Sequence, residues 1–358
     1  MLFTYPEWNI RTVYLMLGFS CNFKCRHCLQ TPTDTCSLVP TEDDIQRVIS
    51  YINTLVLTRP PKQKKLKIIF FGGEPLLYWN IIETVVKSLG DKVLYSIITN
   101  GSLLDTNKIK VINTYNIAVS LSYDDKNTDK IRGIDITNTP GFVELFNSIN
   151  NRGILATITA YNCDLRSTFR DIREVFGENI NISIEPLRHT WGIPNDLVNF
   201  DLTLYQDSLH KMAESVVQDI LTNTITPEVN MFLPSLCSYS GLFKDKSPLA
   251  CGQIYNTLNI DLMGNIYSCH NAGHKVGTID TPRYLLCNNQ DNWVNSHKAP
   301  ACMSCELEGF CKGGCPLETV TSAGNRKLCD ITHIFWNEVK FIATKLLESF
   351  TPLDLQED

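Results

Sequence analysis

Residues 12–28 read Thr-Val-Tyr-Leu-Met-Leu-Gly-Phe-Ser-Cys-Asn-Phe-Lys-Cys-Arg-His-Cys, an apolar, β-rich run followed closely by three cysteines. The run is typical of a strand that is buried on both faces, because it combines β-branched, aromatic and large apolar residues. In a parallel sheet built from βα units, the loop after such a strand lies at the carboxyl edge, where active sites form. We therefore expect Cys21, Cys25 and Cys28 on one tight loop at that edge.

Five more β-rich runs follow the first, and helical patterns separate them. We expect strands at residues 12–17, 67–71, 93–98, 117–121, 154–160 and 180–184, and helices that include residues 41–57 and 79–89. Thr41 suits the N-cap of the first of these helices, with Asp44 at the third helical position. The alternation predicts a parallel sheet. Since six units are too few to close an eight-stranded barrel, we predict a partial (β/α)6 barrel over residues 1–200, open along one side.

Composition limits the class of protein. The 358 residues are 43% hydrophobic and 20% charged, as in ordinary globular proteins, and carry a formal net charge of −6. That charge offers no broad basic surface to nucleic acid. No apolar run is long enough for a membrane helix, and the N-terminus lacks the pattern of a signal peptide. We expect a cytoplasmic protein with neither a nucleic-acid nor a membrane partner.

The first three thiols are one ligand short of a closed metal site. Structural zinc sites use four protein ligands, in most cases from paired Cys-x2-Cys units. A four-iron cluster held by three cysteines instead keeps one iron free for an outside ligand. In a reducing compartment, clustered cysteines indicate metal binding or redox chemistry more than disulfides. An open iron–sulfur cluster is our interpretation, with a zinc knuckle as the alternative.

The spacing Cys-x3-Cys-x2-Cys resembles the cluster motif of the radical S-adenosylmethionine (SAM) superfamily. A second motif, Gly72-Gly73-Glu74-Pro75, follows the second expected strand, where the family's Gly-Gly-Glu-Pro turn receives the amino group of SAM. The resemblance implies a [4Fe–4S] cluster on Cys21, Cys25 and Cys28 with SAM at its open iron. It further implies that SAM is cleaved to methionine and a 5′-deoxyadenosyl radical, which abstracts a hydrogen atom from the substrate.

Four further residues fall where the family contacts SAM. Thr99 and Asn100 end the third expected strand, and Ser120 with Arg132 resembles the family's Ser…Arg pair after the fourth. The resemblance implies contacts to the ribose and carboxylate of SAM, because a guanidinium group matches a carboxylate. The Asp-Gly that usually follows the serine is replaced here by Ser122-Tyr123.

Nine of the fourteen cysteines lie from residue 237 onward, in a region without βα alternation. Their spacing, Cys251, Gly264-x4-Cys269, Cys302-x2-Cys305-x5-Cys311-x3-Cys315 and Cys329, resembles the SPASM domain. The resemblance implies two auxiliary [4Fe–4S] clusters, hence three clusters in all. The outer set would be Cys302, Cys305, Cys311 and Cys329, and the inner set Cys251, Cys269 and Cys315. A multi-zinc ribbon is the alternative.

The sequence does not identify the fourth ligand of the inner set. Some relatives supply a cysteine between the first cysteine and the glycine, but residues 253–263 contain none. The candidates are Cys237, Cys287, a substrate group or an open iron. Cys36 and Cys163 belong to neither set, and we expect them to be small buried residues or free thiols.

The rest of the chain divides into segments that differ in their residue patterns. We expect a helical linker over residues 201–245, the cysteine-rich domain over 246–331, and a closing helix with a frayed tail over 332–358.

Auxiliary clusters suit an oxidative reaction, because a substrate radical that closes a bond must lose an electron. By analogy with the family, we expect a maturase that acts on a short, ribosomally made precursor peptide and installs a C–C, C–S or C–O cross-link between side chains. An external donor such as flavodoxin or ferredoxin would supply electrons. Only twenty residues precede Cys21, so we expect a separate protein, or the two domains themselves, to hold a leader.

Three alternatives remain: a small-molecule dehydrogenase or coupling enzyme of cofactor biosynthesis, a non-catalytic metal-binding scaffold, and a sulfatase-type formylglycine maturase. In the last, an aspartate base follows the Gly-x4-Cys cysteine, whereas His270 follows Cys269. His270 is a candidate acid or base because its charge changes near neutral pH, and a structural histidine is the alternative. The loop of residues 185–191 is a candidate substrate contact.

Overall fold

The computed structural model describes residues 10–30, 40–60, 63–190, 192–241, 251, 253–322, 324, 326 and 328–350. Its sheet has nine strands in the order β6-β5-β4-β3-β2-β1-β7-β8-β9. The first six strands pair in parallel with their neighbours, which confirms the predicted partial (β/α)6 barrel. They are β1 (Thr12–Met16), β2 (Lys67–Phe71), β3 (Leu94–Thr99), β4 (Ala118–Ser122), β5 (Arg152–Ile158) and β6 (Asn181–Pro186).

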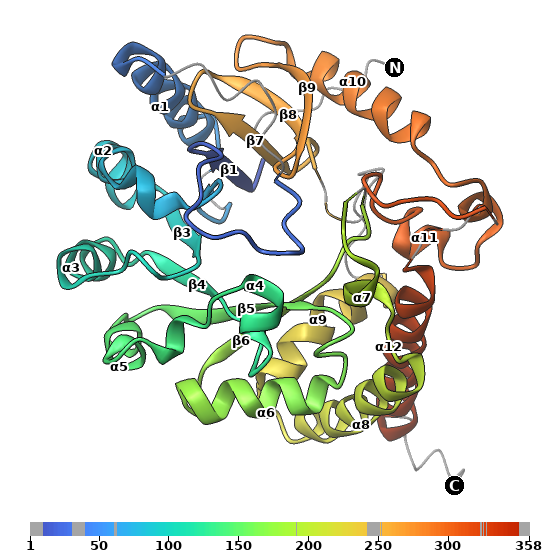
Figure 1. Ribbon diagram of the computed structural model, residues 1–358. Helices are drawn as coiled ribbons and strands as arrows, with labels where there is room; N and C mark the ends of the chain where they lie inside the picture. Colours follow the sequence, from blue (N-terminus) through green and yellow to red (C-terminus); the bar gives the residue numbers. More distant parts are fainter. Residues whose placement is uncertain are drawn as a thin grey trace, which may run out of the picture.

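Helices cover the outer side of this curved sheet (Figure 1). The apolar residues that alternate along each strand pack against them; Val13 and Leu15 of β1, for example, share the core with Ile52, all fully buried. Burial of this kind is the main driving force for the fold. The covering helices are α1 (Glu42–Leu57), α2 (Trp79–Leu89), α3 (Thr106–Thr114), α5 (Phe142–Asn147) and α6 (Leu165–Phe176). The short helix α4 (Thr128–Arg132) instead lies beside the cysteine loop, where the Arg26 amide donates to the Ile131 carbonyl at 3.0 Å.

The N-terminal cap predicted for α1 is present. The Thr41 hydroxyl accepts from the Asp44 amide at 3.2 Å, and the Asp44 carboxylate accepts from the Thr41 amide at 3.0 Å. This reciprocal pair satisfies two amide groups that the first helical turn leaves without partners.

Three strands from the cysteine-rich region extend the barrel sheet. β7 (Thr257–Asp261) pairs in parallel with β1, so that Thr12 lies opposite Thr257, and β8 (Asn265–Cys269) and β9 (Ala272–Thr278) add in antiparallel fashion. The expected boundary at residue 246 therefore falls between elements of one continuous sheet. α10 (Arg283–Ser296) contacts β9, and α11 (Glu308–Cys311) lies in the loops beyond it (Figure 1).

A second group of helices packs beside β6. It comprises α7 (Asn195–Val198), α8 (Leu202–Leu221), α9 (Pro227–Tyr239) and α12 (Cys329–Phe350). α12 lies against both α8 and α9, and the rings of Phe232 and Phe335 stack with centroids 5.4 Å apart. The predicted linker and closing helix thus pack together, and α12 starts at Cys329, three residues earlier than expected.

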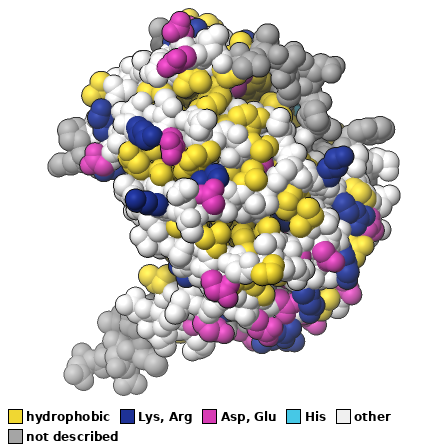
Figure 2. Space-filling model, turned by 60° about the vertical axis from the view of Figure 1, so that its left-hand side comes forward, with side chains coloured by type: hydrophobic (Ala, Val, Ile, Leu, Met, Phe, Trp, Pro, Cys, Tyr) yellow, Lys and Arg dark blue, Asp and Glu magenta, His cyan; other side chains and the backbone are white. Residues whose placement is uncertain are grey.

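The surface carries mixed charge. On the face in Figure 2, basic side chains are interspersed with acidic ones. Among the described residues, no helix combines the length and apolar character needed to cross a membrane.

One ion pair between α8 and α12 predicts a pH dependence. His210 Nδ1 lies 2.8 Å from the Glu338 carboxylate, which raises the pKa of His210. A histidine whose folded-state pKa exceeds its unfolded value of about 6.5 adds stability below that pH, and the contribution is lost as pH rises through the folded-state pKa. Because the His210 side chain is 44% exposed, we expect less than about 1 kcal/mol.

We expect His210→Gln to lower the melting temperature at about pH 5.5 and to leave it nearly unchanged at about pH 9. Thermal unfolding of both proteins across that range checks this. Parallel melting-temperature profiles would contradict the role of the pair.

Candidate active site

The cysteine loop leaves β1 as predicted. Cys21 and Cys28 are exposed and Cys25 is half-buried. Burial, with the neighbouring Cys28 and Cys21 thiolates adding to it against the opposing charge of Arg132, raises the pKa of Cys25 to about 11. The three thiols are therefore electrostatic neighbours on one loop. Three soft sulfur donors with two of them accessible are a donor set that suits an iron–sulfur cluster with one open iron.

The Gly72-Gly73-Glu74-Pro75 turn docks directly on that loop. The Gly73 amide donates to the Gly18 carbonyl and the Glu74 amide to the Ser20 carbonyl, both at 2.9 Å. A Cβ on Gly73 would lie 2.5 Å from the Phe19 carbonyl oxygen and closer still to that of Ser20. Only glycine permits this approach of two backbones.

Glu74 makes several hydrogen bonds that link neighbouring parts of the site. Its buried carboxylate accepts from the Thr99 hydroxyl at 2.7 Å, from the Asn100 amide at 2.9 Å and from the Leu76 amide at 3.0 Å. Burial raises the pKa of Glu74, and the hydrogen bonds oppose that shift. One carboxylate thus joins the end of β2 to the end of β3.

The expected SAM contacts from β3 have protein partners. Thr99 bonds to Glu74, and the Asn100 side chain donates to Asn22 of the cysteine loop at 2.9 Å. Asn100 therefore positions the cysteine loop and Thr99 positions Glu74, and their direct contact with SAM stays a prediction.

Ser120 and Arg132, which were predicted to act as a pair, have different surroundings in the structure. Ser120 is half-buried in the middle of β4 and alternates with core residues, so it faces the barrel interior. Arg132 is buried and donates from Nε and Nη2 to the two oxygens of Asp124, at 2.7 and 2.8 Å. Asp124 follows β4 and is a partner that sequence reasoning missed. Arg132 also lies near Cys25. The ion pair with Asp124 therefore holds a positive charge beside the cysteine loop.

Aromatic side chains line the barrel beside the cysteines. His270 stacks on Tyr14, with centroids 4.1 Å apart and planes 8° apart, and meets Phe71 edge-on at 4.6 Å. Burial lowers the pKa of His270 to about 4. The imidazole is therefore neutral at pH 7 and could accept a proton but not donate one as imidazolium.

Tyr14 connects this aromatic group to the inner thiols. Its pKa is raised, first by burial and then by the charges of Glu185, Cys269 and Cys251. Glu185 belongs to β6, is exposed, and falls in the loop region predicted to contact substrate. Tyr14 was not predicted, although its inward position in β1 follows from the alternation of the strand. Trp191 of the same loop lies outside the described residues.

The pKa values of two downstream thiols respond to other cysteines of their predicted sets. Burial, followed by the Cys315 and Cys251 thiolates, raises the pKa of Cys269 to about 12. Burial, followed by the other three outer thiolates, raises the pKa of Cys329 to about 11; those thiolates are Cys302, Cys311 and Cys305. Among the described residues, no three Cys, His, Asp or Glu side chains converge closely enough to hold a single metal ion. The two ligand sets therefore stay predictions.

The other cysteines lie elsewhere. Cys287 is fully buried in α10, and after burial its pKa responds to Arg283 and Asp291 of the same helix. Cys237 is half-buried near the end of α9. The core position of Cys163 agrees with its prediction as a small buried residue, and Cys36 lies outside the described residues.

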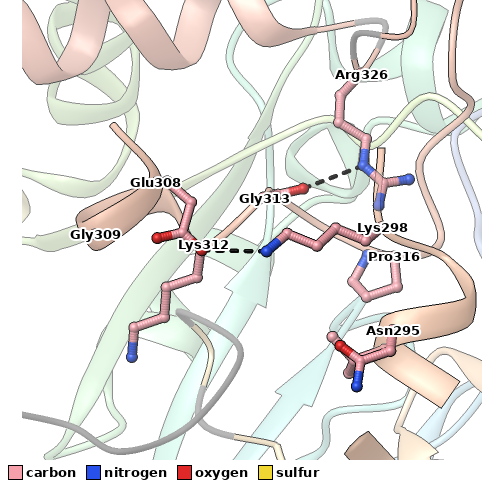
Figure 3. Close-up of a pocket in the computed structure, with 10 residues that line it drawn as sticks. Asn295, Lys298, Glu308, Gly309, Lys312, Gly313, Pro316 and Arg326 are labelled. Carbon is pink, nitrogen blue, oxygen red and sulfur yellow. Dashed lines mark hydrogen bonds and ion pairs between the residues drawn. The ribbon is translucent and has the colours of Figure 1, made fainter. Parts of the chain in front are cut away.

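A pocket of about 260 Å³ lies beside the outer set (Figure 3). On one side Lys298 pairs with Glu308 at 3.3 Å, and on the other the buried Arg326 donates to the Gly313 carbonyl at 3.2 Å. Arg326 also donates to the Glu318 carbonyl at 2.7 Å. These two hydrogen bonds of Arg326 therefore stabilise the turn that runs from Cys311 toward Cys315.

Residues 15–181 match the family described as the radical SAM superfamily. This part of the chain is a radical SAM domain, as the resemblance predicted, and its radical SAM fold implies SAM and a [4Fe–4S] cluster.

Two relatives match most of the chain. Radical SAM cyclopropyl synthase TigE of Paramaledivibacter caminithermalis is 24% identical over 340 residues, which cover 86% of this chain and 68% of TigE. The serine-type anaerobic sulfatase-maturating enzyme of Klebsiella aerogenes is 20% identical over 358 residues, 90% of this chain and 83% of that enzyme.

Two solved structures share the fold. anSMEcpe with bound AdoMet and the Cp18Cys peptide has a TM-score of 0.70 at 17% identity, covering 95% of this chain and 99% of that one. Streptococcus suis SuiB bound to the precursor peptide SuiA has a TM-score of 0.58 at 18% identity, covering 86% and 72%. At these identities the likeness establishes the fold, including its cysteine-rich C-terminal part.

Proposed function

We propose that the protein is a radical SAM maturase with a SPASM domain, which installs an oxidative cross-link in a ribosomally made peptide. The observation that carries this is the position of Tyr14, which stacks on His270 inside the barrel and is an electrostatic neighbour of Cys269 and Cys251 of the inner set. A substrate beside this aromatic group would lie between two redox sites. The peptides in the anSMEcpe and SuiB structures support a peptide substrate.

The chain's residues have distinct roles in this proposal. Cys21, Cys25 and Cys28 would hold the cluster that binds SAM, and the Gly72–Pro75 turn would receive the amino group of SAM. When bound, this cluster and SAM supply a 5′-deoxyadenosyl radical that abstracts a hydrogen atom. Glu74, Asn100 and Arg132 keep the loops around that site in place.

Closing one bond between two side chains removes two hydrogen atoms from the peptide. The first leaves as a hydrogen atom, and the second leaves as a proton and an electron. The inner and outer sets of cysteines would carry the auxiliary clusters that accept this electron. An external carrier such as flavodoxin or ferredoxin, and a separate leader-binding protein, are the partners that we propose.

His270 is our candidate for the group that takes the proton. It is neutral, and it lies in the barrel between Tyr14 and Phe71. The neutral imidazole has a lone pair that can accept a proton from the peptide when the bond closes, and burial makes it a weaker base than an exposed histidine.

Anaerobic co-expression with any short open reading frame beside the gene tests the function. We expect the peptide to lose two hydrogen atoms, with fragmentation blocked between the two linked residues. Serine oxidised to formylglycine loses the same mass, so a hydrazine-type aldehyde probe must give no adduct. An unmodified peptide, from enzyme that still converts SAM to 5′-deoxyadenosine, would contradict the proposal and favour a small-molecule substrate.

Cys311→Ala should separate SAM cleavage from product formation. Removal of one outer ligand damages the outer site, and since the SAM site is built from other loops, 5′-deoxyadenosine should still form while cross-linked peptide falls to background. Both products are quantified by liquid chromatography and mass spectrometry in one reaction. Full cross-linking by this variant would exclude an electron-transfer role for the outer set.

A further inference from the structure

The second half of the cysteine loop has its own attachment to the barrel. The turn of residues 72–75 holds the first half, whereas in the second half the Arg26 amide donates to the Ile131 carbonyl at 3.0 Å. Arg26 follows Cys25 directly and precedes Cys28 by two residues. A shift of Arg26 would therefore move both thiols.

The Arg26 side chain reaches across to α7. Its Nη2 donates to the two carboxylate oxygens of Asp196 at 2.8 and 2.7 Å, and the Tyr161 hydroxyl donates to one of these oxygens at 2.9 Å. α7 is itself attached to the chain that follows β5, because the Ala160 amide donates to the Leu197 carbonyl at 2.8 Å. The carboxylate of Asp196 thus joins the loops that follow β1 and β5.

α7 also ends the connection that begins after β6 and spans residues 187–194. The first part of this connection belongs to the candidate substrate contact. Within it, the His189 carbonyl accepts from the Thr319 amide of the cysteine-rich region at 2.8 Å. The β6–α7 connection is therefore attached to the cysteine-rich region along its length and, through Asp196, to the cysteine loop at its end.

The Arg26–Asp196 pair is open to solvent. The two side chains are 36% and 46% exposed. An exposed ion pair contributes little to the stability of a fold. Loss of this pair should therefore change the position of the cysteine loop and leave the protein folded.

We propose that Arg26 is a positioning residue which, through Asp196, sets the second half of the cysteine loop relative to the β6–α7 connection. The inference rests on the proposed function, because it takes Cys25 and Cys28 as ligands of the SAM-binding cluster and the connection as a substrate contact. Small displacements of positioned reactants lower a reaction rate strongly. Without the pair, SAM binds more weakly and its cleavage is followed less often by reaction with the peptide.

The test compares the reconstituted holoenzyme with Asp196→Asn, Arg26→Gln and the double variant. Each single variant should keep its iron and melting temperature, bind SAM about fivefold more weakly, and form about fivefold more 5′-deoxyadenosine per linked peptide, the most that an exposed pair supports. The double variant should resemble each single one, since all three lack the same interaction. Equilibrium dialysis measures SAM affinity, and mass spectrometry measures the two products.

Asp280→Asn is the matched control. Asp280 forms an exposed ion pair with Arg47 of α1 at 3.2 Å, which also joins distant parts of the chain, and its loss should change neither readout. Tyr161→Phe removes only the hydroxyl that donates to Asp196. If Asp196→Asn loses iron, this variant decides the matter, because it should weaken SAM binding by a smaller factor.

Wild-type SAM affinity in both iron-replete single variants, an unchanged product ratio, or effects that add in the double variant would overturn the inference alone. Wild-type enzyme that cleaves SAM but links no peptide would overturn the proposed function. The SAM affinities of the variants would still test the role of the Arg26–Asp196 pair in that case.

Discussion

Replacing Cys21, Cys25 and Cys28 together with alanine should abolish SAM cleavage and leave about two thirds of the iron in place. The three thiols share one loop after β1, and the proposed auxiliary sets lie in β8, α11, the start of α12 and the loops between them, all beyond residue 250. Iron should fall from about twelve to about eight atoms per chain, as expected for the loss of one four-iron cluster out of three. Anaerobic iron analysis and the yield of 5′-deoxyadenosine measure the two effects.

The matched control is Cys163→Ala. Cys163 is buried in the core near the start of α6 and belongs to no proposed ligand set, so iron and SAM cleavage should both stay at the wild-type level. Loss of iron from all three sites in the triple variant would show that the sites do not form independently. Wild-type SAM cleavage by the triple variant would exclude these cysteines as the cluster ligands.

Gly73→Ala should have the second largest effect. A Cβ there would overlap the carbonyl oxygens of Phe19 and Ser20, and these backbone atoms cannot move without displacing the cysteine loop. Overpacking of this kind costs about 1–3 kcal/mol of stability. Because the turn and the loop would separate, we also expect SAM binding to be lost, which equilibrium dialysis of the reconstituted protein measures.

Gly90→Ala separates steric overlap from backbone strain. Gly90 has a φ of 55°, and a Cβ there would meet no atom within 4 Å. With a ψ of −135°, this backbone conformation is one that side chains other than glycine rarely adopt, so the substitution should cost about 1–3 kcal/mol but leave SAM binding intact. Equal SAM affinity in the Gly73 and Gly90 variants would refute the close approach as the reason for the glycine.

Much of the barrel could be predicted because its signals are local. Strands β1 to β6 and helices α1 and α2 follow from apolar runs and from the cap at Thr41, and each lies within two residues of its expected bounds. The two cysteine motifs could be found for the same reason, since their members are close in sequence. Their division into two ligand sets stays a prediction.

Long-range pairings could not be predicted. The junction of β7 with β1 joins residues about 245 positions apart, and no residue type in either strand specifies the other. The Arg132–Asp124 pair was missed because an arginine eight residues after a carboxylate has many possible partners. Arg188 and Glu318 each look like ordinary loop residues until the fold brings them to 3.8 Å.

The pairing of β1 with β7 bears on how far electrons must tunnel. β1 leads into the first cysteine loop and β8, one strand beyond β7, ends at Cys269 of the inner set. The SAM-binding site and the proposed inner cluster site therefore lie at the ends of strands of one hydrogen-bonded sheet, with a strand spacing of about 4.8 Å. Strands that are hydrogen-bonded in one sheet do not move apart as two hinged domains can. A substrate that enters or leaves the barrel therefore does not change the spacing of these strands. The rate of the outward electron step should then depend on reduction potentials and not on conformational gating.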